Sequence, residues 1–200
     1  MQYKKIIFIL LLPLLVEILS SCCRCPELNH YEYSNCDITL QNLDNSGPNI
    51  IVAMSDSITE DNYAIRVAVN RSLDVCETYN YPSLFINSAT ACSCPSDTWT
   101  PRQEIRSLKI YTINHFDSSH YANSEVTEYF SAFSGDFSTD IDSFIKNYNY
   151  EANGYEDYER LFDLLLNTTP TIGNKHRFKI VVSLAEGKKI IKKTSEVILY

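Results

Sequence analysis

Apolar and polar residues alternate with a period of two in several stretches of this chain. The clearest stretches cover residues 38–42, 50–54, 65–69, 108–113 and 178–184. Because successive side chains of a β-strand point to opposite faces, each stretch predicts a strand with one face in a core. Phe162, Leu164 and Leu166 also lie two apart, so we predict a strand over residues 161–166 rather than a short helix.

The residues between these stretches favour turns and short helices. Asn45 to Pro48 and Glu186-Gly187 are typical turn sequences, and the second predicts a C-terminal hairpin with its return strand over residues 188–200. Short helices are expected over 124–133 and from Thr139 onwards. Hairpin-linked strands without βαβ spacing predict a mainly β fold, an antiparallel two-sheet sandwich, immunoglobulin-like, with short helices in long loops.

The N-terminal segment has the pattern of an export signal. Lys4 and Lys5 precede an apolar run over residues 6–16, and Leu-Ser-Ser-Cys ends the segment at Cys22. The run is shorter than the ~20 residues that a membrane-spanning helix needs, and small residues precede the cut of a secretory signal. We predict that residues 1–21 are a lipoprotein signal peptide, removed by cleavage before Cys22.

The Leu-Ser-Ser-Cys ending resembles the lipobox of bacterial lipoproteins. That resemblance implies a diacylglycerol on the thiol of Cys22 and a membrane anchor; the alternative is an ordinary signal peptide followed by structural cysteines. Residues 22–35 are polar and contain proline, which predicts a tether before a β-domain over residues 36–200. We expect a cell-envelope protein at the outer membrane. A periplasm-facing position is favoured over the surface, because no acidic cluster follows the cysteine.

Six cysteines remain when Cys22 is set aside, which is an even number. An oxidising envelope favours disulfides, and the candidates are Cys23, Cys25, Cys36, Cys76, Cys92 and Cys94. The two members of a Cys-X-Cys pair rarely bond each other because the geometry is strained, so we expect Cys76 to bond Cys92 or Cys94. The alternatives are a redox pair or a metal site, although zinc usually takes wider Cys spacings.

Charge is distributed unevenly along the chain. The formal net charge of −8 argues against nucleic acid as a partner and against electrostatic adhesion to anionic lipid. Residues 117–163 hold eleven acidic side chains, whereas residues 175–193 hold seven basic ones. We expect these two surfaces to complement each other in the fold, with a ligand patch as the alternative.

The densest group of polar side chains is His115, Asp117 and His120. Two imidazoles and a carboxylate are possible ligands of a transition metal, and Asp, His and Ser are also the parts of acyl-transfer sites. A polar loop after a strand explains the same residues, because Asp and Ser side chains accept hydrogen bonds from turn backbones. An envelope hydrolase or metal-binding protein is therefore the alternative function.

A second stretch is rich in tyrosine and carries Tyr150, Tyr155 and Tyr158. Exposed tyrosines offer an apolar face and a polar tip, so binding of a glycan or an envelope protein is the functional hypothesis for this stretch. A solvated loop whose tyrosines fold back onto the sandwich explains the same residues and is favoured over it. No phosphate loop, nucleophile elbow or dinucleotide fingerprint is present, and no cofactor is expected. The main hypothesis is a non-catalytic binding or structural module.

Several segments together point to a family. They are the Cys-Cys-Arg-Cys-Pro after the signal, Leu40 to Pro48, Tyr63 to Val67, residues 115–120 with 126–130, and the C-terminal hairpin. They resemble an uncharacterised family of Bacteroidetes lipoproteins of this length, a domain of unknown function. The resemblance implies the same localisation and a β-rich fold, and it supplies no catalytic residue.

Overall fold

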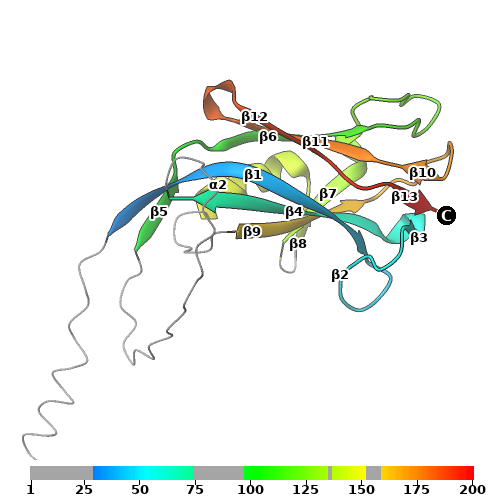
Figure 1. Ribbon diagram of the computed structural model, residues 1–200, viewed down its shortest axis with the longest axis horizontal. Coiled ribbons are helices and arrows are strands. Elements are labelled where there is room, and N and C mark those ends of the chain that lie inside the picture. The colour runs from blue at the N-terminus through cyan, green and yellow to red at the C-terminus, as the bar shows by residue number, and fades with distance from the viewer. Residues whose placement is uncertain (1–28, 74–96, 135–136, 152–158) are drawn as a thin grey trace, which may run out of the picture. The chain divides into compact units, whose positions relative to one another are not determined.

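The computed structural model describes residues 29–73, 97–134, 137–151 and 159–200. These residues are mainly β, with largely antiparallel sheets, which is consistent with the expected β-sandwich (Figure 1). The chain divides into two compact units: Met1–His30 with Thr78–Thr98, and Tyr31–Glu77 with Trp99–Tyr200. The predicted signal peptide and Cys22 lie outside the described residues, and the second unit holds the strand residues other than His30 and Thr98.

The largest sheet orders its strands β2-β1-β4-β9-β7-β8, and β5 also pairs with β1. The pairs β1–β4, β4–β9 and β9–β7 are antiparallel. The strand predicted over 161–166 is confirmed as part of β9. The bounds are β1 His30–Asp44, β2 Ile51–Val52, β4 Tyr63–Ser72, β5 Thr98–Pro101, β7 Phe130–Ser134, β8 Phe137–Thr139 and β9 Glu159–Leu166.

Two three-stranded sheets complete the described β-structure, in the orders β12-β11-β6 and β10-β13-β3. The predicted C-terminal hairpin is confirmed for β11 and β12, joined by the 3-10 turn η3 (Ala185–Gly187), but β13 leaves it to pair with β10 and, in parallel, with β3. The bounds are β3 Ser57–Ile58, β6 Ile105–Thr112, β10 Lys175–His176, β11 Phe178–Leu184, β12 Lys189–Lys193 and β13 Val197–Leu199.

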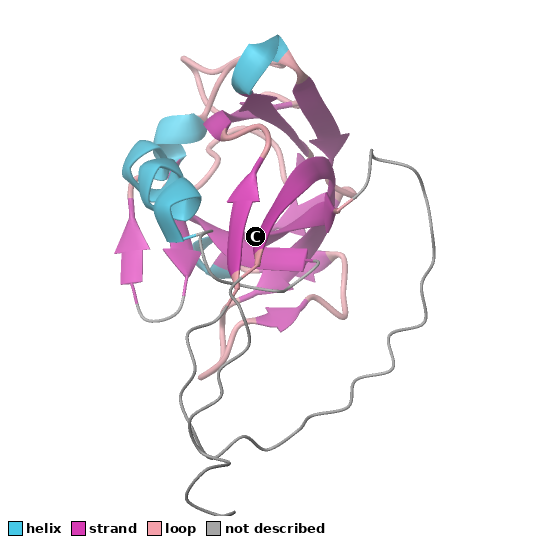
Figure 2. Cartoon of the chain, turned by 90° about the vertical axis from the view of Figure 1, so that its left-hand side faces the viewer, coloured by secondary structure: helices cyan, strands magenta, loops and turns pink. Residues whose placement is uncertain are grey.

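The one α-helix among the described residues is α2, Ile141–Glu151, as predicted from Thr139 onwards (Figure 2). The Asp140 carboxylate accepts a 2.8 Å hydrogen bond from the Ser143 N–H, which is the usual N-cap contact. The buried side chains follow the spacing of one helix face: Ile141, Phe144, Ile145 and Tyr148. No helix in the described ranges is long and apolar enough to cross a membrane.

The helix predicted over 124–133 is wrong. Only the 3-10 turn η2, Thr127–Tyr129, forms there, and β7 begins at Phe130. Phe130 and Ala132 are buried while Ser131 between them is half-buried, so the side chains alternate as in a strand. Pairing with β9 stabilises the strand and overrides the helical signal of Glu125 and Glu128. A further 3-10 turn, η1, covers Glu60–Asn62.

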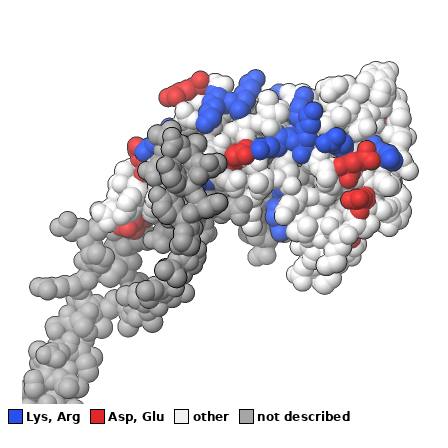
Figure 3. All heavy atoms as spheres, viewed as in Figure 1, with Lys and Arg blue, Asp and Glu red and all other residues white. Residues whose placement is uncertain are grey.

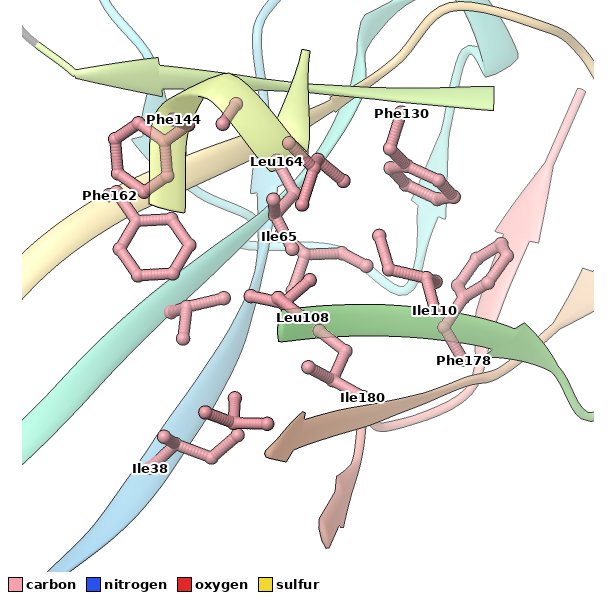
Figure 4. Close-up of a cluster of buried hydrophobic side chains, with 14 of the residues drawn as sticks. Ile38, Ile65, Leu108, Ile110, Phe130, Phe144, Phe162, Leu164, Phe178 and Ile180 are labelled. Atoms are coloured by element: carbon pink, nitrogen blue, oxygen red, sulfur yellow. The ribbon is translucent and has the colours of Figure 1, made fainter. Parts of the chain in front are cut away.

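The core lies where the inner faces of the large sheet, the β6–β11–β12 sheet and α2 meet. Figure 4 shows Ile65, Leu108, Ile180 and Phe178 directed toward one another from β4, β6 and β11. Burying each such side chain contributes about 2 kcal/mol. The alternating apolar residues that predicted the strands are therefore the residues that pack between the sheets.

The predicted tether over residues 22–35 ends earlier than expected, because β1 begins at His30. Tyr33 and Asn35 are buried, and the Asn35 amide donates a 3.0 Å hydrogen bond to the Gln103 carbonyl. A polar residue such as Asn35 can fill an inward position when its side chain is hydrogen-bonded, although a hydrophobicity pattern does not predict it. Residues 30–35 therefore belong to the sheet.

Candidate functional site

The loop after β6 brings two of the three predicted metal candidates together. The imidazole Nδ1 of His120 lies 3.0 Å from each carboxylate oxygen of Asp117. The Tyr129 hydroxyl lies 3.2 Å from the same carboxylate, and Glu128 Oε1 lies 3.6 Å from His120 Nε2. His115 lies elsewhere, exposed and edge-on to the ring of Tyr121.

The Asp117 carboxylate also organises the loop itself. It accepts 2.7 Å hydrogen bonds from the backbone N–H groups of Ser119 and His120. Desolvation raises the pKa of Asp117, but these bonds and those from His120 and Tyr129 outweigh it, so the pKa lies below its usual range. The carboxylate is a loop-stabilising group, in line with the polar-loop interpretation of the sequence.

No group of three His, Cys, Asp or Glu side chains within the described ranges is arranged to hold a metal ion. The predicted set of His115, Asp117 and His120 supplies only the last two to one place. Both ring nitrogens of His120 already face carboxylates, Asp117 on one side and Glu128 on the other. The arrangement favours a structural imidazole–carboxylate contact over an open coordination position.

A second cluster lies on the outer face of the large sheet and was not predicted from the sequence. The strand registers place Gln41, Arg66, Asp163 and Phe133 side by side on β1, β4, β9 and β7. Arg66 Nε and Nη2 donate to the two oxygens of Asp163, each at 2.8 Å. This bidentate contact holds the guanidinium and the carboxylate in one plane.

The pair forms the base of a groove of about 380 Å³. Its lining combines polar and apolar side chains from three strands and the loop before β2: Asn49, Ile50, Arg66, Phe133, Leu161, Phe162 and Asp163. Leu161 is 48% exposed on one wall, whereas Asp163 is only 6% exposed at the base. The volume falls within the range of about 300–1,000 Å³ of small-molecule pockets.

The charges in the groove belong to one ion pair, in which Arg66 binds both carboxylate oxygens of Asp163. The hydrogen bonds from Arg66 to Asp163 raise the pKa of the guanidinium further above its ordinary value, against the smaller effect of burial. The side chain of Arg66 is 26% exposed and that of Asp163 is 9% exposed. The base of the groove is therefore polar and electrically neutral.

The sequence does contain a signal for this groove. Arg66 and Asp163 each interrupt an apolar strand at a position that alternates outward. Pairing them requires the β4–β9 register, and one sequence alone does not reveal that register.

Most of the other predicted site residues lie outside the described residues. This holds for Cys22, Tyr155, Tyr158, the side chain of Tyr150, and for Cys23, Cys25, Cys76, Cys92 and Cys94. Cys36 lies in β1 at a register shift between Asn35 and Asp37, with its sulfur 3.5 Å from the Ser34 carbonyl. The disulfide and tyrosine hypotheses therefore stay predictions.

The fold and the groove define a class: a mainly β domain with a neutral, partly apolar concave surface on one sheet. A family model described as "Domain of unknown function (DUF5034)" matches residues 35–196, and the chain belongs to this family. Searches of curated proteins and of solved structures found no match. The match begins within β1 and ends just before β13, so it covers most of β1, the strands from β2 to β12 and the residues that line the groove.

Proposed function

We propose that this protein is a non-catalytic binding module of the cell envelope, and that the groove over Arg66 and Asp163 takes a neutral glycan. The observation that carries the proposal is the combination of a bidentate ion pair with apolar lining residues, of which Leu161 is exposed and Phe133 half-buried. A charged ligand would have to break or compete with that pair. A neutral polar ligand would not.

The pair keeps hydrogen-bonding capacity that suits hydroxyl groups. A guanidinium has five N–H donors, and Arg66 gives two of them to Asp163. Each carboxylate oxygen accepts one of these bonds and has a further lone pair. A sugar hydroxyl both donates and accepts, so it can bind both members of the pair, while its C–H face packs on Phe133 or Leu161.

Isothermal titration calorimetry of the purified full chain with a panel of neutral oligosaccharides tests this function. Phe133→Ala and Leu161→Ala each remove part of a wall, and we expect at least about ten-fold weaker binding, since one lost apolar contact costs about 1.5 kcal/mol. Ile191→Ala, at a position on another sheet with exposure close to that of Leu161, is the matched control for Leu161→Ala. If no oligosaccharide of the panel bound, or if both wall variants bound as tightly as the parent chain, the groove would be excluded as the glycan site.

The proposal includes a lipid anchor at Cys22, which brings the module to a membrane. It is supported by the charged, apolar and small-residue pattern of the first 22 residues. Cys22→Ala should abolish incorporation of a labelled fatty acid and release the protein from the membrane fraction. A variant that stays lipidated or membrane-bound would rule the anchor out. An outer-membrane, periplasm-facing position in a Bacteroidetes cell belongs to the same proposal.

The alternative of a hydrolase or metal-binding protein has less support, because His115 lies apart from Asp117 and His120. An immunoglobulin-like arrangement of the sandwich would suit a binding module, since loops at the ends of such a fold vary without disturbing the core. That topology stays a prediction. An envelope protein as the ligand is the other form of the binding hypothesis.

A further inference from the structure

The outer face of the β6–β11–β12 sheet concentrates lysines. Lys179 and Lys193 are direct cross-strand partners, Tyr111 and Lys179 are partners on the other side, and Lys109 and Ile191 both flank Val181. We call Lys109, Lys179, Lys189 and Lys193, with Tyr111, Val181 and Ile191, the lysine face. Figure 3 shows Lys and Arg side chains gathered over the region where Figure 1 labels these strands.

The charge of the lysine face is largely uncompensated. Lys109 forms a 2.9 Å ion pair with Glu125, but among the described residues no carboxylate lies within 4.0 Å of Lys179, Lys189 or Lys193. The ammonium group of Lys179 lies 4.4 Å from the centre of the Tyr111 ring. Like charges directly opposite each other on two strands destabilise the pairing. The face therefore holds its positive charge at a cost to the sheet.

The neighbouring acidic side chains do not remove this charge. Lys175 pairs with Glu196 and Lys192 with Asp37, and both contacts lie off the lysine face. None of the described ion pairs joins the basic residues 175–193 to the acidic residues 117–163, so the expected mutual compensation of the two runs is not seen there. The positive charge stays available to a partner.

The chemistry of the lysine face fits a diffuse anionic surface better than one defined ligand. Lysine carries its charge on one ammonium group at the end of a flexible side chain. It lacks the planar guanidinium with which arginine forms bidentate hydrogen bonds to a single phosphate or carboxylate. Ile191 is 54% exposed among the lysines, and lysine stems are themselves aliphatic. A sheet face of this kind offers several ammonium groups at one level, with apolar atoms between them.

We propose that the lysine face docks the domain on an anionic phospholipid membrane. We choose this partner because the lysines complement phosphate headgroups in charge, and because the exposed Ile191 and the half-buried Tyr111 suit the membrane interface. The docking is independent of the groove on the other sheet. It would act together with the lipid anchor of the proposed function, which would supply a second membrane contact at Cys22.

The net charge of −8 does not oppose this docking. Screening limits electrostatic attraction and repulsion to about 8 Å at physiological ionic strength. Carboxylates on other surfaces of the domain therefore contribute little to a contact made by one face. The net charge of the whole sequence gives the wrong expectation for anionic lipid, because the fold gathers lysines that are distributed over residues 109–193.

Vesicle sedimentation tests the docking with the full chain carrying Cys22→Ser, which takes no lipid. Vesicles of phosphatidylcholine mixed with phosphatidylglycerol are compared with phosphatidylcholine alone, which measures any charge-independent binding. We expect binding to the anionic vesicles that falls steeply with salt. Lys179→Gln/Lys189→Gln/Lys193→Gln should weaken it about a hundred-fold, since each lysine near such a surface contributes about five-fold.

The control variant loses the same charge elsewhere: Arg102→Gln/Lys146→Gln/Lys175→Gln, all exposed residues off the lysine face. It should bind like the parent chain, and both variants should keep the parent's circular dichroism and melting temperature. Equal loss in the two variants, equal binding to both vesicle types, or full competition by inorganic phosphate would overturn the proposal. The last result would indicate a discrete phosphate site. Failure here leaves the glycan titration unaffected, because that experiment reports on other residues.

Discussion

Two solvent-facing sheet surfaces of this protein carry charge in opposite ways. In the groove, Arg66 and Asp163 neutralise each other at 2.8 Å in a partly buried, concave site. On the lysine face, Lys179 and Lys193 lie opposite each other on neighbouring strands. Both surfaces arise from charged residues at alternate positions of strands. The difference lies in which residue the register places on the neighbouring strand, so register rather than composition sets the chemistry of each face.

The comparison also separates two kinds of binding. A closed ion pair between apolar walls favours one neutral ligand in a defined orientation, because its hydrogen-bonding groups are already fixed. Uncompensated lysines attract any sufficiently dense array of negative charge and respond to salt. The two faces can therefore act at the same time, one on a ligand and the other on a membrane.

The largest expected effect comes from breaking the groove pair. Asp163→Ala leaves the guanidinium of Arg66 partly buried without its partner, and we expect a loss of about 3 kcal/mol in the free energy of unfolding. Urea denaturation followed by tyrosine and tryptophan fluorescence measures the change. A loss below about 1 kcal/mol would mean that the pair behaves as an ordinary surface contact.

A double variant sharpens the same experiment. Arg66→Met/Asp163→Leu replaces both charges with apolar side chains of similar size, and stability should return to within about 1 kcal/mol of the parent. The groove would keep its walls but lose its polar base, so binding of a neutral glycan should be lost although the domain stays folded. Retained glycan binding in this stable variant would show that the ion pair is not the recognition element.

A smaller effect should appear with pH, and it arises in the interior rather than on either face. Burial lowers the pKa of His176, against smaller opposing effects of the Gly173 carbonyl and Glu60. Since the folded state binds this proton less readily than the unfolded chain does, stability is full above about pH 6.5 and falls as the pH drops below it.

Melting temperatures between pH 7 and pH 5 measure how steeply the stability falls with pH. His176→Leu keeps an apolar contact beside Phe116 and Phe178 and removes the titrating group, so its melting temperature should fall less over the same range. An unchanged slope in the variant would assign the effect to other groups.

The strands were the most predictable part of the fold. Residues 65–69, 108–113 and 178–184 alternate clearly because one side of each strand faces the core, and α2 follows from its cap at Asp140. The first strand was partly missed, because residues 30–35 are mostly polar and one of the inward positions is taken by Asn35. The helix predicted near Glu125 failed because cross-strand pairing of β7, a non-local contact, outweighs local preference.

The candidate site was harder to predict for the same reason. Asp117 and His120 are near each other in sequence, and the loop does bring them together. Arg66 and Asp163 are 97 residues apart, and only the β4–β9 register makes them partners. The lysine face likewise requires three strands in register. The negative net charge of the chain therefore gave no indication that one face is basic. Local contacts can be read from a sequence, whereas cross-strand contacts need the topology.

The smallest expected effect tests the lysine face without removing any side chain from the core. Lys193→Glu places a carboxylate directly opposite Lys179, and the new cross-strand attraction should stabilise the sheet by about 0.5 kcal/mol. The same change should weaken binding to anionic vesicles, because it lowers the charge of the face by two. Stability and vesicle binding should thus move in opposite directions, measured by urea denaturation and by sedimentation of one protein preparation. If instead Lys193→Glu destabilised the domain, the two lysines would not be repelling each other in the folded state, and the contrast between the two faces would rest on the groove pair alone.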